Sequence, residues 1–176
     1  MLSVARPDRK PAMTRTIDDF DRAADPAEAG TDWELIADRV MGGRSLGTLE
    51  RGIVQGRMAL RMTGDVSLEN DGGFVQFARD VAPPPEGAEG LALDVTGNGE
   101  TYNVHLRTGD VTRPWQSYRQ SFDAPPDWRT IRLPFAGFQA HRIDAPLDLT
   151  TLRRIGIVAI GRAFRADVAL AAIRYV

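Results

Sequence analysis

Apolar and polar residues alternate with a period of two along most of the chain, which is typical of half-buried β-strands. In the segment 102–107 the alternation is cleanest, with Tyr102, Val104 and Leu106 on one face and Asn103, His105 and Arg107 on the other. Comparable patterns predict further strands at 33–37, 48–54, 57–62, 66–69, 74–79, 91–95, 117–122, 128–133, 153–160 and 166–175. Many short strands at this spacing indicate a sandwich or barrel.

Glycine, proline and asparagine clusters separate the predicted strands. Gly97-Asn98-Gly99 is interpreted as a hairpin turn, because it is short and precedes a strand. Helix is predicted to be scarce: Pro26 and Gly30 interrupt the helix formers of 18–30, and only a short turn is expected over 148–155. Since strands and helices do not alternate, a parallel α/β sheet is not expected. The fold class predicted is all-β, a two-sheet antiparallel sandwich with little helix.

Composition narrows the possible functions. The 176 residues carry a net charge of −2, which argues against nucleic-acid binding, because that requires a basic surplus. The absence of cysteine excludes disulfides, thiolate metal sites and cysteine nucleophiles. The chain has no apolar run long enough for a membrane span or a secretory signal, so a cytoplasmic location is expected. Residues 1–15 are predicted to be a disordered tail and 16–176 a single domain.

One string is enzyme-like. Residues 43–47 fit G-x-S-x-G, so Ser45 could be a nucleophile, with His141 and either Asp94 or Asp110 completing a triad. The motif normally follows a strand and opens a helix, and that context is missing, so a glycine-rich structural turn is the favoured interpretation. His105 and His141 do not have metal-ligand spacing, and no cofactor or metal is expected.

A binding face is predicted from the polar sides of two strands. In 117–122 the inward set is Tyr118, Gln120 and Phe122, where the polar Gln120 is the exception to the pattern. Trp115, beside Arg113-Pro114, is expected to be buried under its loop, and the alternative is that it stacks on a ligand or partner. The candidate binding residues are Asn103, His105, Arg107, Trp115, Arg119 and Ser121.

Several strings together carry a family resemblance: Trp33 followed by D-R-V-M-G-G-R-S at 38–45, N-D-G-G-F at 70–74, and L-P-F-A-G-F at 133–138. The chain resembles the complex I intermediate-associated protein 30 family over about residues 16–176. The resemblance implies a galactose-binding-like jelly roll and a non-enzymatic role as an assembly factor or chaperone for respiratory NADH:ubiquinone oxidoreductase. It also implies that the motif turn, with Asp38, Met41, Gly42, Gly43 and Ser45, is shared by the family and holds no nucleophile.

Three functional hypotheses result. The first is a module that binds a protein partner, such as complex I subunits or assembly intermediates, through a concave sheet face rich in arginine. The second is a carbohydrate-binding module in which Trp115 or Tyr118 near Arg107 supplies an aromatic platform. The third is a serine hydrolase acting through Ser45.

Overall fold

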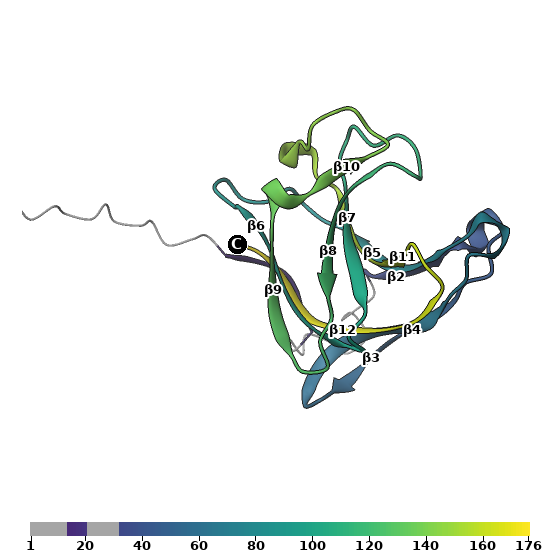
Figure 1. The fold of residues 1–176 in the computed structure, drawn as a ribbon. Helices are drawn as coiled ribbons and strands as arrows, with labels where there is room; N and C mark the ends of the chain where they lie inside the picture. Colours follow the sequence, from purple (N-terminus) through teal and green to yellow (C-terminus); the bar gives the residue numbers. More distant parts are fainter. Residues whose placement is uncertain (1–13, 21–31) are drawn as a thin grey trace, which may run out of the picture.

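Two antiparallel sheets face each other in the computed structural model (Figure 1), which describes residues 14–20 and 32–176. The β12 sheet runs in the order β3-β4-β12-β6-β9 and also contains β1; the β7 sheet runs in the order β10-β8-β7-β11-β5-β2. The strands of the β12 sheet are β1 (Arg15–Asp19), β3 (Leu46–Val54), β4 (Arg57–Val66), β6 (Gly90–Gly97), β9 (Arg129–Pro134) and β12 (Phe164–Tyr175). Those of the β7 sheet are β2 (Glu34–Ala37), β5 (Phe74–Asp80), β7 (Thr101–Arg107), β8 (Ser117–Asp123), β10 (Gln139–His141) and β11 (Arg154–Ile160). The predicted two-sheet antiparallel class is confirmed.

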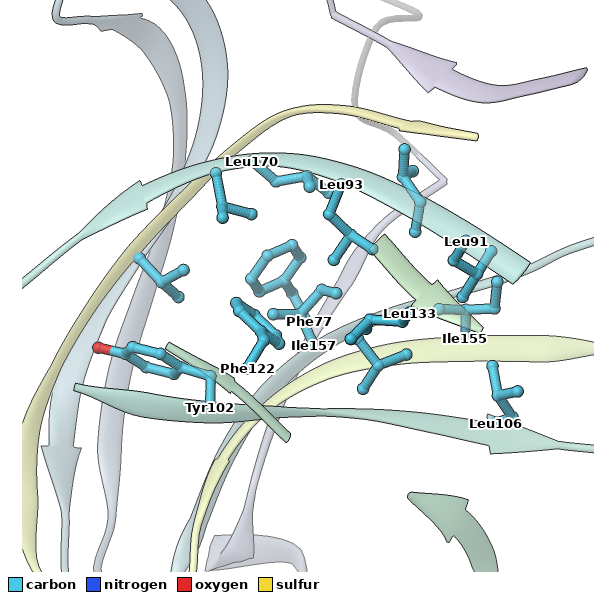
Figure 2. Close-up of a cluster of buried hydrophobic side chains, with 14 of the residues drawn as sticks. Phe77, Leu91, Leu93, Tyr102, Leu106, Phe122, Leu133, Ile155, Ile157 and Leu170 are labelled. Carbon is cyan, nitrogen blue, oxygen red and sulfur yellow. The ribbon is translucent and has the colours of Figure 1, made fainter. Parts of the chain in front are cut away.

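The core fills the space between the sheets. Figure 2 shows leucines of the β12 sheet, among them Leu93 and Leu170, meeting Phe77, Tyr102 and Ile157 of the β7 sheet. All five side chains are fully buried. They are the inward members of alternating strands, so the sequence pattern and the packing agree.

The predicted hairpin at Gly97–Gly99 is wrong. β6 pairs with β12 and β9, whereas β7 pairs with β11 and β8, so the turn carries the chain from one sheet to the other. Tyr102 fixes this crossing: its hydroxyl donates to Asn98 Oδ1 at 2.7 Å and accepts from the backbone N–H of Asp167 at 2.8 Å. Burial raises the pKa of Tyr102 to about 12.

The remaining elements differ from the sequence expectation in several places. The predicted strand 66–69 is wrong, because β4 continues to Val66 and a 3₁₀ helix, η2 (Glu69–Asp71), follows. The pattern missed the short edge strands β1 and β10.

The turn expected over 148–155 is present as η4 (Leu149–Thr151); the other 3₁₀ helices are η1 (Asp38–Met41) and η3 (Phe135–Gly137). Residues 1–13 of the predicted tail 1–15 and residues 21–30 of the broken helix pattern 18–30 lie outside the described residues, whereas the strand β1 takes in Arg15 from the first segment and Asp18 and Asp19 from the second. No helix in the described part of the chain is long and apolar enough to cross a membrane.

The motif turn is organised around Asp38, a fully buried carboxylate. It accepts hydrogen bonds from the Ser45 backbone N–H at 2.9 Å, from Ser45 Oγ at 2.5 Å and from the N–H groups of Gly73 at 2.5 Å and Phe74 at 3.3 Å. Burial alone would raise the pKa of Asp38, but these hydrogen bonds outweigh it and lower the pKa. The carboxylate therefore ties the loop after η1 to the loop before β5.

Glycines make room for this carboxylate. Gly42 ends η1 at φ +85°, a left-handed conformation that favours glycine, while a Cβ on Gly43 would collide with the Asp38 carboxyl group. The glycine-rich structural turn is therefore what the structure shows at this motif; the side chain of Met41 is not among those described.

We predict that Asp38→Asn lowers the free energy of unfolding by about 2–4 kcal/mol, because an amide cannot accept all four hydrogen bonds and leaves buried donors unpaired. Since the folded pKa is lowered, the carboxylate's contribution is complete above about pH 5 and is lost as pH falls through the folded value. Urea denaturation at pH 7 and pH 3 measures both effects. Asp65→Asn is the control, because Asp65 forms only an exposed ion pair with Arg165; equal losses in the two variants would contradict the prediction.

Candidate functional site

The outer face of the β7 sheet collects the polar residues of neighbouring strands. Directly paired residues of antiparallel strands project from the same face. Asn103 lies between Ser121 and Val158, and His105 lies between Arg119 and Gly156. Arg107 is paired with Arg154 on β11. The structure thus places five of the six predicted binding residues on one face: Asn103, His105, Arg107, Arg119 and Ser121.

A small cavity of about 60 Å³, called the hollow below, lies over the centre of this face. Its floor exists because two small residues, Gly156 and Ala78, are paired across β11 and β5. Its walls come from five strands and from the loop before β8: Ile36, Gln76, His105, Arg107, Pro114, Gln116, Ser117, Arg119 and Arg154.

A larger cavity of about 300 Å³, called the groove, lies beside it toward the β10 edge. It is lined by side chains of β7, β8 and β10 and by η3, namely Asn103, Arg119, Gln120, Ser121, Gly137, Gln139, Ala140 and His141. Arg119 lines both cavities, so the hollow and the groove share a wall.

Two residues that line the hollow have a buried nitrogen without a hydrogen-bond partner among the described residues: His105 Nε2 and Arg107 Nε. A third such atom, Arg51 Nε, belongs to β3 in the other sheet. Buried polar atoms are normally paired in folded proteins, and each exception calls for an explanation such as an absent ligand.

Cations dominate the electrostatics of the hollow. Burial, with Arg119, His141 and Arg107 adding to it, lowers the pKa of His105 to about 3, so its ring is uncharged at neutral pH. Burial and neighbouring arginines also lower the pKa of Arg107 and Arg119, yet a guanidinium stays protonated at any ordinary pH.

The arginines of this face differ in how they are paired. Arg154 is neutralised by Asp80 at 2.8 Å and Glu34 at 2.9 Å. The charged residues that lower the pKa of Arg107 and Arg119 are themselves arginines. Both Arg107 and Arg119 in turn lower the pKa of His105. Arg119 Nε donates to Ser117 Oγ at 2.8 Å, and Arg107 Nη2 donates to the Arg113 carbonyl at 3.3 Å. Among the described residues, neither forms an ion pair, so their positive charge is available to a ligand.

The sixth predicted residue, Trp115, lies on the loop before β8. Gln116 braces this loop: its Oε1 accepts from the N–H groups of Thr112 and Arg113, both at 3.1 Å, and its Nε2 donates to the Arg142 carbonyl at 3.2 Å. Trp115 itself is 52% exposed, so the expectation that the loop buries it is wrong. It lines neither cavity.

Two alternative assignments are not supported by the geometry. Tyr118 cannot serve as a sugar platform, because it is buried in the core and its hydroxyl donates to the Ala145 carbonyl at 2.6 Å. Ser45 is also buried, and its hydroxyl bonds to Asp38 and to the backbone of Ser67, with no described histidine as a partner. The serine triad is therefore not assembled. His141 is the last residue of β10.

Sequence reasoning missed the residues that shape the cavities, chiefly Gly156, Ala78, Gln76 and Gln139. A glycine inside the apolar strand 153–160 was a usable signal, because such a glycine weakens a strand unless something approaches it closely. The other three carry no such signal, since their roles depend on which strands become neighbours.

Comparisons with known proteins agree on the fold and leave the ligand open. A sequence model of the family described as complex I intermediate-associated protein 30 matches residues 19–169. No curated protein matches the chain. A family 11 carbohydrate-binding module from Clostridium thermocellum, solved with a β-1,3-1,4-mixed-linked tetrasaccharide, superposes with a TM-score of 0.73 at 12% identity, covering 93% of this chain and 95% of the module. A family 30 carbohydrate-binding module gives a TM-score of 0.55 at 14% identity, covering 76% and 91%. The fold is accordingly the jelly-roll sandwich of these modules.

We predict that His105 makes stability depend on pH between 5 and 7. The unfolded chain binds a proton at His105 near pH 6.5 and the folded chain only near pH 3, so the free energy of unfolding falls as pH falls, by about 2 kcal/mol over this range. His105→Gln is expected to remove most of this dependence of the free energy of unfolding on pH, as measured by urea denaturation. His141→Gln is the matched control and keeps most of it, because only His105 has a buried, unpaired ring nitrogen among the described residues. An unchanged slope in His105→Gln would contradict the prediction.

Proposed function

Because the chain belongs to the complex I intermediate-associated protein 30 family, we propose that it is a non-catalytic module that binds a protein partner on the outer face of its β7 sheet. The partners that the family's description suggests are subunits or assembly intermediates of respiratory complex I. The module binds its partner without transforming it.

The observation that carries this proposal is the pair of unpartnered nitrogens, His105 Nε2 and Arg107 Nε, at the centre of that face. Leaving a buried donor such as Arg107 Nε unpaired is unfavourable by about 1–3 kcal/mol, and a partner group that reached it would remove the penalty. Arginine also suits this task, because its planar guanidinium pairs and stacks well in protein interfaces.

The two cavities favour a protein partner over a sugar. Among the described residues, no Phe, Tyr or Trp side chain lines the hollow or the groove. Sugar recognition needs an apolar, usually aromatic, surface against the ring as well as polar contacts. The exposed Trp115 belongs to the loop before β8 and lines neither cavity.

The test is site-specific photo-crosslinking in the native host. A photoreactive residue replaces Ser121, exposed at the groove, or, as the control, Arg132, exposed on β9 of the other sheet. We expect complex I subunits to be crosslinked from position 121 and not from position 132. Crosslinking of no protein from position 121, or the same proteins from both positions, would contradict the proposed binding face.

A carbohydrate ligand is the second candidate, supported by the shared fold and by the exposed Trp115. We expect the β-1,3-1,4-linked tetrasaccharide to leave the melting temperature unchanged at millimolar concentration, because the cavities offer it no aromatic platform. A rise in melting temperature that Trp115→Ala abolishes would instead favour the carbohydrate-binding role.

A further inference from the structure

We propose that the hollow receives a single carboxylate, the side chain of an Asp or Glu on the partner, between Arg107 and Arg119 with the His105 ring as a third contact. This inference rests on the proposed function, since it names the chemistry by which the partner is recognised. It predicts that the partner presents an acidic segment to the β7 sheet.

Charge is the first argument. Two guanidinium groups line one small cavity, and no described carboxylate pairs with either of them. The third arginine of the hollow, Arg154, is already neutralised by Asp80 and Glu34. The hollow therefore carries an uncompensated positive charge on its β7–β8 side, and an anion entering there would meet two cations.

Size is the second argument. The hollow has a volume of about 60 Å³, and by the same measure a single water needs about 10–15 Å³. Sites for whole small molecules are larger, about 300–1,000 Å³. A carboxylate group therefore suits the hollow better than a sugar ring or a nucleotide base does. The floor of Gly156 and Ala78 provides the space, because a larger side chain at either position would fill it.

Hydrogen bonding is the third argument. A carboxylate accepts several hydrogen bonds, and guanidinium groups present donors in a planar arrangement that matches it. Arg107 Nε, which is always a donor, has no acceptor among the described residues, and the buried Nε2 of His105 has no hydrogen-bond partner there. A carboxylate between these groups supplies the acceptors that the described residues do not.

The experiment uses the full chain and two capped peptides, Gly-Ser-Glu-Ser-Gly and Gly-Ser-Gln-Ser-Gly. Titration is followed by NMR on the side-chain Nε–Hε signals of arginine. We expect the Glu peptide to move the signals of Arg107 and Arg119 and the Gln peptide to move neither. Equal shifts with both peptides, or no shift with the Glu peptide, would overturn the proposal.

Variants that remove one positive charge distinguish binding at the hollow from non-specific electrostatic attraction to the protein. Arg107→Gln is expected to weaken binding of the Glu peptide at least tenfold. Arg132→Gln removes the same charge from an exposed position on β9 and is expected to change binding less than twofold. Equal weakening by both variants would mean that only overall charge matters, and would overturn the proposal.

A cavity-filling variant tests the site with every charge kept. A Cβ on Gly156 would lie 2.8 Å from Gln76 Oε1, the movable end of a flexible side chain, so Gly156→Ala is expected to fold while narrowing the hollow. We expect Gly156→Ala to weaken binding of the Glu peptide at least fivefold. Gly52→Ala, on β3 with open space around its Cβ, is the matched control and leaves binding unchanged. Full binding by a folded Gly156→Ala variant would contradict the proposed position of the carboxylate.

The two proposals fail in different ways. If position 121 crosslinks complex I subunits while the Glu peptide does not shift the NMR signal of Arg107, the proposed binding face stands and the proposed carboxylate site is wrong. If the Glu peptide binds while position 121 crosslinks nothing, the carboxylate site stands and the role in assembly is wrong. Inorganic phosphate that displaces the Glu peptide at a tenfold lower concentration would overturn the carboxylate in favour of a phosphate ligand.

Discussion

The burial of Tyr102, Val104 and Leu106 between the two sheets decides where the rest of β7 points. All three side chains are fully buried, and Tyr102 is further fixed by hydrogen bonds at its hydroxyl. Because side chains alternate along a strand, the other face of β7 has to carry Asn103, His105 and Arg107. A slip of one residue would place three polar groups in the core, so the register is strongly held. The geometry of the outer face is therefore a consequence of core packing.

The chain treats its buried charged and titratable groups in two opposite ways. Asp38 is completely buried and accepts four hydrogen bonds, so its charge is compensated within the fold. His105 and Arg107 lie on the outer face beside further cations, and each leaves a buried nitrogen unpaired. The contrast is that backbone and side-chain donors of the fold satisfy the Asp38 carboxylate, whereas no described group satisfies the buried nitrogens of His105 and Arg107. Buried polar atoms without a hydrogen-bond partner are expected chiefly at functional sites, where a ligand can supply the missing partner. The motif turn is thus structural, and the hollow is the place to look for function.

The sequence pattern predicted the faces of single strands better than it predicted their neighbours. The inward set of β7 and the outward positions of Arg119 and Ser121 follow from alternation within each strand, and the structure agrees. The Gly97–Gly99 turn was misassigned because a short glycine turn can close a hairpin or cross between sheets, and only strand pairing distinguishes the two. The hollow could not be foreseen either. Its floor joins Ala78 and Gly156, which are far apart along the chain, and only the register of β5 with β11 brings them together.

The same sandwich serves proteins that bind quite different ligands, because the fold fixes the backbone and leaves the outer face to vary. The family 11 module that superposes on this chain was solved with a tetrasaccharide, yet the two share 12% identity, so the likeness concerns the backbone alone. What a face binds depends on the size, charge and hydrogen-bonding capacity of its own side chains. Here the cavity at the centre of the face is far smaller than sites that hold whole small molecules, and two of its three arginines, Arg107 and Arg119, form no ion pair among the described residues. A neutral polysaccharide would also contribute no charge to balance them. An acidic protein segment supplies both a group of the right size and the missing negative charge, and for this reason we propose a protein partner on a fold that is shared with carbohydrate-binding modules.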